Sequence, residues 1–187
     1  MIILGYIFTI LNYACYCLSR FMKQKVAILA LDLIAKIFTA LGLYCLNSLS
    51  GAYIYILAFA MLIIANIKEM LNKEWICGYI LFQSLYFIVL YETYAGVSSL
   101  LVVLVATIKL FSVWFLPPQG MRFMGGINSW IYLMYQISIK NWAGLLEIFS
   151  FLSNIISYVK YKKRKERKHT NKKLARNLRI RSDQLQK

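Results

Sequence analysis

Histidine, proline and acidic residues are scarce in this chain of 187 residues, which holds one histidine, two prolines and seven Asp and Glu. The histidine, His169, lies in a basic stretch near the end of the chain. This position argues against zinc chemistry, and against a Cys–His or Ser–His catalytic pair, in the apolar part of the sequence. Because no nucleophile and base, and no set of metal ligands, stand together, we expect no enzymatic activity, no metal and no cofactor.

Cysteine is also rare, and Cys15, Cys17, Cys45 and Cys77 lie in apolar runs without a neighbouring histidine. Cys15 and Cys17 are two positions apart, so on a helix their side chains point in different directions and cannot share a metal ion. We interpret all four as small, buried apolar side chains.

Apolar residues make up 60% of the chain, compared with about 45–50% in a typical soluble domain. Uncharged runs of about 17 or more residues recur along it, as in transmembrane helices. Transmembrane β-strands would alternate apolar and polar residues over about 10 positions, and these runs do not alternate. The sequence therefore predicts an all-α, polytopic membrane helix bundle with about seven transmembrane helices.

The predicted spans are 2–18, 26–46, 52–67, 75–90, 97–115, 123–139 and 143–159. The turn-forming cluster Asn47-Ser-Leu-Ser-Gly51 separates the second span from the third. Pro117-Pro118 ends the fifth span, because proline cannot continue a helix. Gly125-Gly126 weakens the predicted start of the sixth span.

The spans are arranged as three helices, a linker helix and three more helices. We divide the chain into a transmembrane bundle (1–160), with a first triplet (1–70), a linker helix (74–91) and a second triplet (95–160), and a basic cytoplasmic tail (161–187). Ser48-Leu-Ser-Gly51 and Asn141-Trp-Ala-Gly144 occupy matching turns of the two triplets. Residue identity between the halves is slight, so this match is either a coincidence of loop lengths or a parallel repeat of the kind found in transporters.

Basic residues in the predicted loops indicate the orientation of the bundle. The loops on one side, together with the tail, hold Arg20, Lys23, Lys25, Lys68, Lys73 and Arg122 and the basic tail cluster. The opposite loops hold only Lys140. This bias predicts an N-terminus outside the cell and a tail in the cytoplasm.

Short motifs in both halves resemble those of a known family. The stretches 122–132 (Arg-Phe-Met-Gly-Gly-Ile-Asn-Ser-Trp-Ile-Tyr), 141–147 (Asn-Trp-Ala-Gly-Leu-Leu-Glu) and 150–163 look like the C-terminal half of the bacterial inner-membrane proteins called YgjV. The basic loop after the first span and the turn Leu-Asn-Ser-Leu-Ser-Gly-Ala (46–52) are similar to the front half, so the likeness covers about residues 5–163. The resemblance implies a multi-pass protein of the bacterial inner (plasma) membrane, of uncharacterised substrate and activity.

The YgjV family in turn resembles the SWEET and PQ-loop (MtN3-like) group of small-solute carriers in its plan of three, one and three helices. PQ-loop proteins place Pro-Gln inside the first helix of each triplet, where it acts as a hinge. In this chain Pro118-Gln119 lies at the cytoplasmic exit of the fifth span, and the first triplet has no Pro-Gln. We therefore interpret the dipeptide as a helix stop and transfer no hinge role to it.

Asp32 and Lys36 place two charges inside the second span. At a rise of about 1.5 Å per residue, Asp32 lies roughly 10 Å and Lys36 roughly 16 Å from its cytoplasmic end, in a membrane core about 30 Å thick. An Asp four residues before a Lys shares its helix face, and a charge at the bilayer centre costs about 2.5–3.5 kcal/mol. The two residues are therefore either a neutralising structural pair or clamp between helices, or part of a site that binds a polar solute or passes protons.

Lys109 lies roughly 10 Å from the Pro117 end of the fifth span. Its side chain can extend to the cytoplasmic surface; alternatively, it faces Asp32 across the repeat axis. The second arrangement gives the bundle centre two lysines and one aspartate, which favours an anionic or zwitterionic solute. Glu147 lies within a turn of the outer surface, so we expect it to be solvated.

Asn12, Gln83, Asn128 and Asn154 lie at similar predicted depths in four different spans. Hydrogen bonds between membrane helices contribute about 0.6–2 kcal/mol each, so Asn12, Gln83 and Asn154 are predicted to join helices. Asn128 has either this role or one in a substrate site, with Trp130 as a platform for the substrate. The candidate substrate-binding residues are Asp32, Lys36, Lys109, Asn128 and Trp130.

The tail is strongly basic, because 13 of the 22 Lys and Arg lie from Lys160 onward. It has little aromatic interleaving and starts where a span ends, which argues against nucleic acid as a partner. We predict that it binds anionic lipid head groups, at about 1 kcal/mol per basic residue near the surface. The predicted lipid-contacting residues are Lys162, Lys163, Arg164 and Lys165.

Two functions of different classes agree with these patterns. The first is passive or proton-coupled transport of a small polar solute through the bundle centre, by a monomer or a homodimer. It predicts that Asp32→Asn or Lys36→Met abolishes uptake and leaves expression intact. The second is a non-transporting membrane scaffold or partner subunit, whose tail recruits lipid or protein. It predicts that these variants misfold and that deletion of the tail removes the phenotype.

Overall fold

The computed structural model describes residues 2–71, 73 and 75–164, and all regular structure in these ranges is helical. The α-helices are α1 (Ile2–Arg20), α2 (Lys25–Cys45), α3 (Leu49–Leu71), α4 (Ile76–Glu92), α5 (Val97–Phe115) and α6 (Pro118–Ser138). A short 3-10 helix, η1 (Trp142–Leu146), leads directly into a last helix over 147–164. Each of the predicted spans falls on one of these helices.

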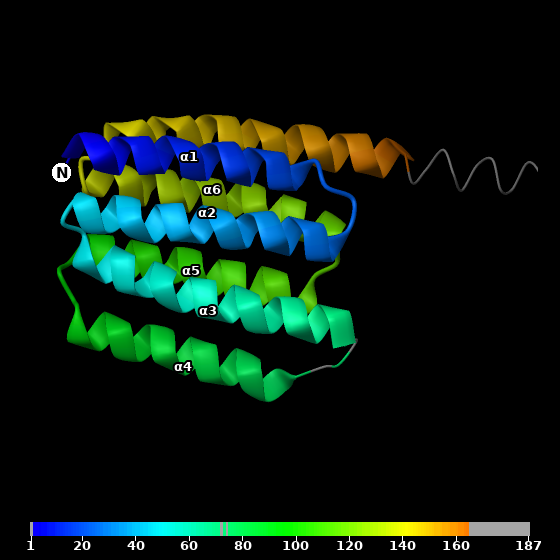
Figure 1. Cartoon of the computed structure of the whole chain (residues 1–187), viewed down its shortest axis with the longest axis horizontal. Helices are drawn as coiled ribbons and strands as arrows, with labels where there is room; N and C mark the ends of the chain where they lie inside the picture. Colours follow the sequence, from blue (N-terminus) through cyan, green and yellow to red (C-terminus); the bar gives the residue numbers. More distant parts are fainter. Residues whose placement is uncertain (1, 72, 74, 165–187) are drawn as a thin grey trace, which may run out of the picture.

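The helices lie side by side with nearly aligned axes, and consecutive helices run in opposite directions (Figure 1). The α1–α2, α3–α4 and α5–α6 connections lie at the end of the bundle where residue 164 lies, which we call the tail end (Figure 1). The remaining connections lie at the opposite end. α2 packs against α1 and α3, and α5 packs against α3, α4 and α6, so that α4 forms one edge of the bundle.

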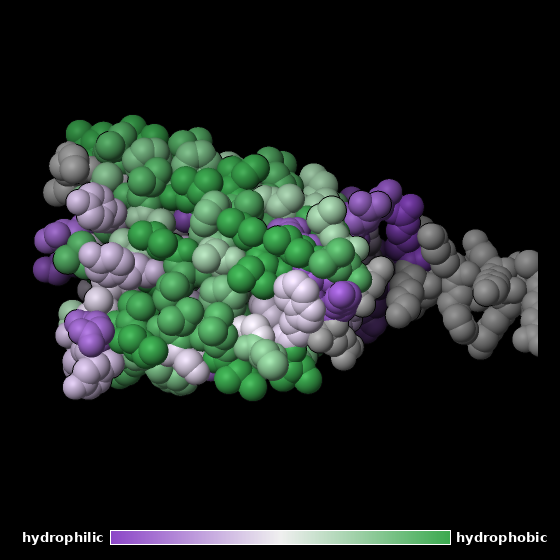
Figure 2. Space-filling model, turned by 60° about the horizontal axis from the view of Figure 1, so that its bottom comes forward, coloured by the Kyte–Doolittle hydropathy of each residue, from purple (hydrophilic) through white to green (hydrophobic). Residues whose placement is uncertain are grey.

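Apolar side chains cover the sides of the bundle, and polar side chains gather towards its ends (Figure 2). Ile80, Phe87 and Trp142 each expose more than half of their surface, and apolar surface of this extent is unusual on a soluble monomer. The helices that are long and apolar enough to cross a membrane are Lys25–Cys45, Leu49–Leu71, Val97–Phe115 and Trp142–Arg164. By length and composition, the described part of the chain is therefore compatible with a membrane protein.

Proline and asparagine define two of the helix boundaries. α5 ends at Phe115, as predicted, and Pro118 is the first residue of α6, where its missing N–H leaves no helical hydrogen bond unmade. Asn47 lies between α2 and α3 with a φ of 60°, a left-handed conformation that Asn adopts more readily than most residues. The predicted breaks are confirmed at both places, although α3 already begins at Leu49.

α6 begins five residues before the predicted start of the sixth span, so Gly125 and Gly126 lie inside the helix and do not weaken its start. A Cβ atom on Gly125 would lie 2.6 Å from Oδ1 of Asn154. On Gly126 the nearest atoms would be those of the Phe151 ring, at 3.8 Å. The absence of a side chain at Gly125 therefore allows α6 and the last helix to approach each other at Asn154.

The predicted tail is only partly described. Lys162, Lys163 and Arg164 are exposed in the final turn of the last helix. Lys165 and the rest of the tail lie outside the described residues, as does residue 74 at the start of the predicted linker helix.

Candidate functional site

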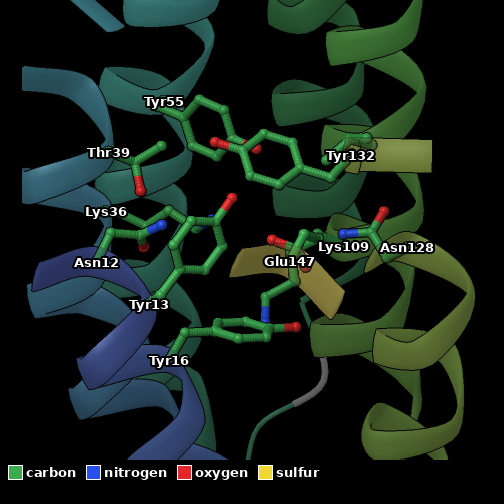
Figure 3. A pocket seen from close by; sticks show the side chains of 11 residues that line it. Asn12, Tyr13, Tyr16, Lys36, Thr39, Tyr55, Lys109, Asn128, Tyr132 and Glu147 are labelled. Carbon is green, nitrogen blue, oxygen red and sulfur yellow. The ribbon is translucent and has the colours of Figure 1, made fainter. Parts of the chain in front are cut away.

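A polar cavity lies inside the bundle, between α1, α2, α3, α5, α6 and the first residue of the last helix (Figure 3). Its volume is about 20 Å³, which is room for about one water molecule. The lining residues are Asn12, Tyr13, Tyr16, Lys36, Thr39, Tyr55, Val105, Lys109, Asn128, Tyr132 and Glu147. All of these except Val105 have side chains that form hydrogen bonds, in contrast to the apolar surface of the bundle.

Asp32 of α2 is fully buried and bound by side chains of two other helices. Nη2 of Arg20 donates to Oδ1 at 2.8 Å and to Oδ2 at 2.7 Å, Oγ of Ser19 donates to Oδ1 at 2.6 Å, and Nζ of Lys109 also binds Oδ2. Lys36 is not among these partners, so the ion pair considered within α2 does not form. Two cations and a hydroxyl group satisfy the carboxylate instead, and Asp32 joins α1, α2 and α5. Lys109 accordingly points towards Asp32 and not towards the surface.

Lys36 extends from α2 into the cavity, where its Nζ lies 4.3 Å from the centre of the Tyr55 ring. An aromatic face attracts an ammonium group, by about 2 kcal/mol when the pair is desolvated. Lys109 repels Lys36 electrostatically, and Asp32 and Glu147 attract it. Among the described residues no carboxylate lies within ion-pair distance of Lys36, so a ligand can bind its ammonium group.

Glu147 is 5% exposed and lies in the cavity wall, so the prediction that it is solvated is wrong. The five residues of η1 precede it, and a 3-10 helix rises about 2 Å per residue. This rise carries Glu147 from the opposite end of the bundle into its interior. Tyr13 and Ser129 are close neighbours of the carboxyl group, and Lys36 lies within electrostatic range of it.

Tyrosine rings surround the cations of the site. The Tyr16 ring centre lies 4.0 Å from Cζ of Arg20 and 5.4 Å from Nζ of Lys109. Tyr55 and Tyr132 meet edge to face, with ring centres 5.8 Å apart. Because ring faces carry negative charge density, these tyrosines stabilise positive charge without adding an anion.

Several polar atoms around the cavity are buried without a hydrogen-bond partner among the described residues. Two of them belong to residues that line the cavity, Oη of Tyr13 and Oδ1 of Asn128, and a third, Oγ of Ser129, lies next to Glu147. Nearly all buried polar groups in proteins form hydrogen bonds. The site therefore has both donors and acceptors that a polar ligand can satisfy.

The charges around the cavity do not balance. Arg20, Lys36 and Lys109 are cations and Asp32 and Glu147 are anions, and all five are buried. With every group ionised, the site carries a formal charge of +1. A ligand with one negative charge would neutralise it.

The remaining candidate residues lie partly in the cavity and partly outside it. Asn12 and Asn128 line the cavity, whereas Trp130 does not. Trp130 is 54% exposed and packs edge to face on Phe151, with ring centres 5.2 Å apart. Trp130, predicted as a deep platform for the substrate, therefore lies outside this cavity. On a helix with 3.6 residues per turn, side chains two positions apart point to nearly opposite sides, so Asn128 and Trp130 cannot both face the cavity.

Gln83 and Asn154 lie away from the cavity lining. Nε2 of Gln83 donates to Oγ1 of Thr107 at 3.1 Å, which joins α4 to α5. Nδ2 of Asn154 donates to the carbonyl oxygen of Ser150 in its own helix at 2.9 Å.

Polar contacts close the tail end of the bundle. Nε of Arg122 donates to the carbonyl oxygen of Arg20 at 3.1 Å, and Nη2 donates to that of Met22 at 2.6 Å. Oγ of Ser157, in the last helix, donates to the carbonyl oxygen of Arg20 at 2.8 Å. Arg122 is 2% exposed, so this predicted loop cation holds the end of α1 from inside the bundle.

A second group of contacts closes the opposite end. Oγ of Ser48 and Oη of Tyr135 lie 2.9 Å apart, and Nδ2 of Asn141 donates to Oε1 of Gln136 at 2.9 Å. A Cβ atom on Gly51 would collide with the Tyr135 hydroxyl, so glycine is needed there for α3 to approach α6. The residues that line the cavity between these two ends are at most 9% exposed.

The cysteines take no part in this site. Within the protein, Cys15, Cys17 and Cys45 are partly buried and Cys77 is exposed on the apolar helix α4. Within the described residues no cluster of His, Cys, Asp or Glu is arranged to hold a metal ion.

Arg20, Glu147 and the cavity tyrosines were missing from the predicted site. For Glu147 the signal was present, because an acidic residue inside a predicted apolar span indicates an interior partner. The position of Arg20 directly after an uncharged run favours a loop, whereas its burial depends on Asp32 from the next helix. No pattern separates Tyr55 and Tyr132 from the other tyrosines, since the chain holds 14 of them.

Comparison with protein-family models, curated proteins and solved structures gave no match for this chain. The resemblance to the YgjV family therefore stays a prediction.

Proposed function

We propose that this protein is an integral membrane carrier that binds a small anionic or zwitterionic solute in the central cavity. The observation that carries the proposal is a buried polar cavity, lined by two lysines and one glutamate, inside a bundle whose outer surface is apolar. Lys36 is the residue best placed to bind the negative group of the solute, because its ammonium group faces the cavity without an ion-pair partner among the described residues. Glu147 and the tyrosine rings suit a positive group, if the solute has one.

The position of the cavity supports a carrier. Its walls come from the first three helices and from α5, α6 and the last helix, so it lies between the proposed triplets, where transporters built from repeats bind their substrates. In this conformation it has room for about one water molecule, so a solute enters only when the bundle opens. The contacts of Arg122 at the tail end and of Tyr135 at the opposite end are the ones that such opening must break.

We further propose that the bundle lies in the bacterial inner membrane with its N-terminus outside and its tail in the cytoplasm. The loop cations support this orientation. Two fusions test this orientation, one with a reporter after Lys187 and one with the same reporter before Met1. The reporter is one that is active only in the cytoplasm. Activity only of the fusion after Lys187 is expected, and activity of both fusions would contradict an odd number of crossings.

Thermal unfolding of the purified protein, with and without candidate solutes, tests the carrier. The panel contains monocarboxylates, amino acids, nucleosides and sugars, and we expect only an anionic or zwitterionic class to raise the melting temperature. Lys36→Met should abolish this rise, whereas Lys140→Met, at an exposed loop lysine, should retain it. The carrier proposal fails if no class stabilises the wild-type protein, or if both variants respond like wild type.

The second candidate is a membrane scaffold or partner subunit that acts through its basic tail. It is favoured by the exposed Lys162, Lys163 and Arg164, which extend past the apolar part of the last helix. A strain that retains the bundle but lacks residues 162–187 distinguishes the two functions. The scaffold is supported if this strain shows the same phenotype as a strain without the protein, while the truncated protein keeps the wild-type rise in melting temperature with solute.

A further inference from the structure

We propose that Glu147 is a proton-binding site, and that its proton and an anionic solute bind in the cavity together. The inference rests on the carrier function proposed above and names the group that would couple solute binding to protons. It follows from the different surroundings of the two buried carboxyl groups.

Asp32 is held in its ionised form by its contacts. Arg20, Lys109 and Ser19 all bind its oxygens, and its side chain is 0% exposed. Protonation of Asp32 would leave two buried cations without an anion, which is strongly unfavourable. Asp32 is therefore a fixed charge.

Over the described ranges Glu147 has no cationic partner at contact distance, and its polar neighbours are the hydroxyl groups of Tyr13 and Ser129. Among the described residues no cation lies within ion-pair distance of its carboxyl group, although it is almost fully buried and faces the cavity. A buried carboxylate without a paired cation is costly, and protonation removes the cost. Glu147 is therefore the buried carboxyl group that can gain and lose a proton.

The charged groups around Glu147 determine how its protonation affects solute binding. The charged and titratable side chains that face it or interact with it are Tyr13, Tyr16 and Arg20 of α1, Lys36 of α2, Tyr55 of α3, Lys109 of α5 and Tyr132 of α6. The tyrosines are neutral near pH 7, and Arg20 and Lys109 are already bound to Asp32. Lys36 is the cation that acts most strongly on Glu147.

Proton and solute binding are coupled through Lys36. While Glu147 is ionised, its negative charge repels an anionic solute at the Lys36 ammonium group. When Glu147 is protonated, the formal charge of the site rises from +1 to +2 and the attraction for an anion increases. Lower pH should therefore tighten the binding of an anionic solute.

Infrared difference spectroscopy of the solute-free protein tests the proton site directly. Between about pH 8 and about pH 5, exposed carboxyl groups with pKa values near about 4 stay largely ionised, so a protonated-carboxyl band should come from Glu147. The band should be missing from Glu147→Gln and present in Glu92→Gln, which changes an exposed carboxyl group at the end of α4. If Glu147→Gln does not fold, Glu147→Asp keeps a carboxyl group and should retain the band at a shifted titration midpoint. The proposal is overturned if wild type shows no band, or if Glu147→Gln keeps it.

Lactate, as a small monocarboxylate probe, tests the coupling. For one proton bound with each anion, its Kd should fall by up to about tenfold for each pH unit of acidification. In Glu147→Gln the Kd should be independent of pH and close to the low-pH value of wild type. A pH-independent Kd in wild type overturns the coupling. Absence of lactate binding together with a clear infrared band would count against the carrier function and leave the proton site intact.

Discussion

Arg20 and Asp32 form an ion pair in which one guanidinium nitrogen donates to both carboxylate oxygens, and both side chains are 0% exposed. The pair joins the last turn of α1 to the middle of α2, across the turn at residues 21–24. Lys109 binds the same carboxylate from α5. A buried network of this kind is stable only while all of its charges are compensated, and it therefore fixes the positions of three helices around the cavity.

Replacement of Asp32 should destabilise the bundle. In Asp32→Asn two buried cations lose their anion, which should lower the free energy of unfolding by about 3–5 kcal/mol. Denaturant unfolding in detergent micelles measures this loss. Glu69→Gln is the matched control, because Glu69 is paired with Lys25 at 2.8 Å but is partly exposed, and such surface pairs contribute about 0–1 kcal/mol. Equal losses in the two variants would contradict a structural role of Asp32 in joining the three helices.

Lys36→Met and Lys109→Met should have different effects on the melting temperature. Methionine fills a similar volume and loses the contact with the Tyr55 ring, but it also removes the cost of burying a charge without an ion-pair partner among the described residues. Stability should therefore be unchanged or higher. Lys109→Met removes a direct partner of Asp32 and should lower the melting temperature clearly. The two variants are compared by thermal unfolding without solute. A larger loss in Lys36→Met would show that this lysine is structural and not available to a ligand.

Adjacent glycines in α6 give a steric test of the packing. Gly125→Ala places a methyl group against Asn154 and should cost about 1–3 kcal/mol, as overpacking usually does. Gly126→Ala meets only Phe151 at ordinary contact distance and should gain up to about 1 kcal/mol from helix propensity. Melting temperatures of the two variants should therefore move in opposite directions. A stabilised Gly125→Ala protein would contradict the close approach of α6 and the last helix.

The helices could be predicted from the sequence because their signals are local. The uncharged runs, the Asn47 turn and Pro117 each depend on neighbouring residues only, and the helices observed agree with them apart from their ends. The ends moved because polar residues such as Arg20 and Lys25 continue a helix once a partner or a turn satisfies them. Orientation in a membrane and the family resemblance stay predictions.

The candidate site could be predicted only in part, because its contacts join distant residues. The charges in the second and fifth spans indicated an interior site, and both Asp32 and Lys109 take part in one network. Asp32 is paired with Arg20 of α1 and not with Lys36, and the spacing of residues within α2 does not reveal this partner. Glu147 lies in the cavity wall because the 3-10 helix η1 carries it inwards. Trp130 lies outside the cavity because the helical period turns it away from the side on which Asn128 lies.

The exposed end of the last helix should bind anionic lipid. Replacing Lys162, Lys163 and Arg164 by glutamine should weaken retention of phosphatidylglycerol by about 1 kcal/mol per residue. Native mass spectrometry of the full chain in mixed phosphatidylcholine and phosphatidylglycerol micelles measures the bound lipid. Lys140→Gln, at the opposite end of the bundle, should change retention little. Equal losses from both ends would indicate nonspecific attraction.

Arg122 should control the order of the α1–α2 turn. Its guanidinium group donates to the carbonyl oxygens of Arg20 and Met22, and Tyr161 donates to the carbonyl oxygen between them at 2.7 Å. Arg122→Ala removes two of these hydrogen bonds and leaves carbonyl groups at the end of α1 to be satisfied by water. Hydrogen exchange of the amides in residues 18–24 should therefore become faster.

Lys23→Ala is the matched control, because Lys23 lies in the same turn but is exposed; its exchange should resemble wild type. If the tail end opens when the carrier releases solute, Arg122→Ala should also reduce the thermal shift caused by a bound solute, since the observed conformation is less favoured. Faster exchange with an unchanged solute response would limit Arg122 to a structural role. Unchanged exchange would show that Ser157 and Tyr161 hold the turn without it.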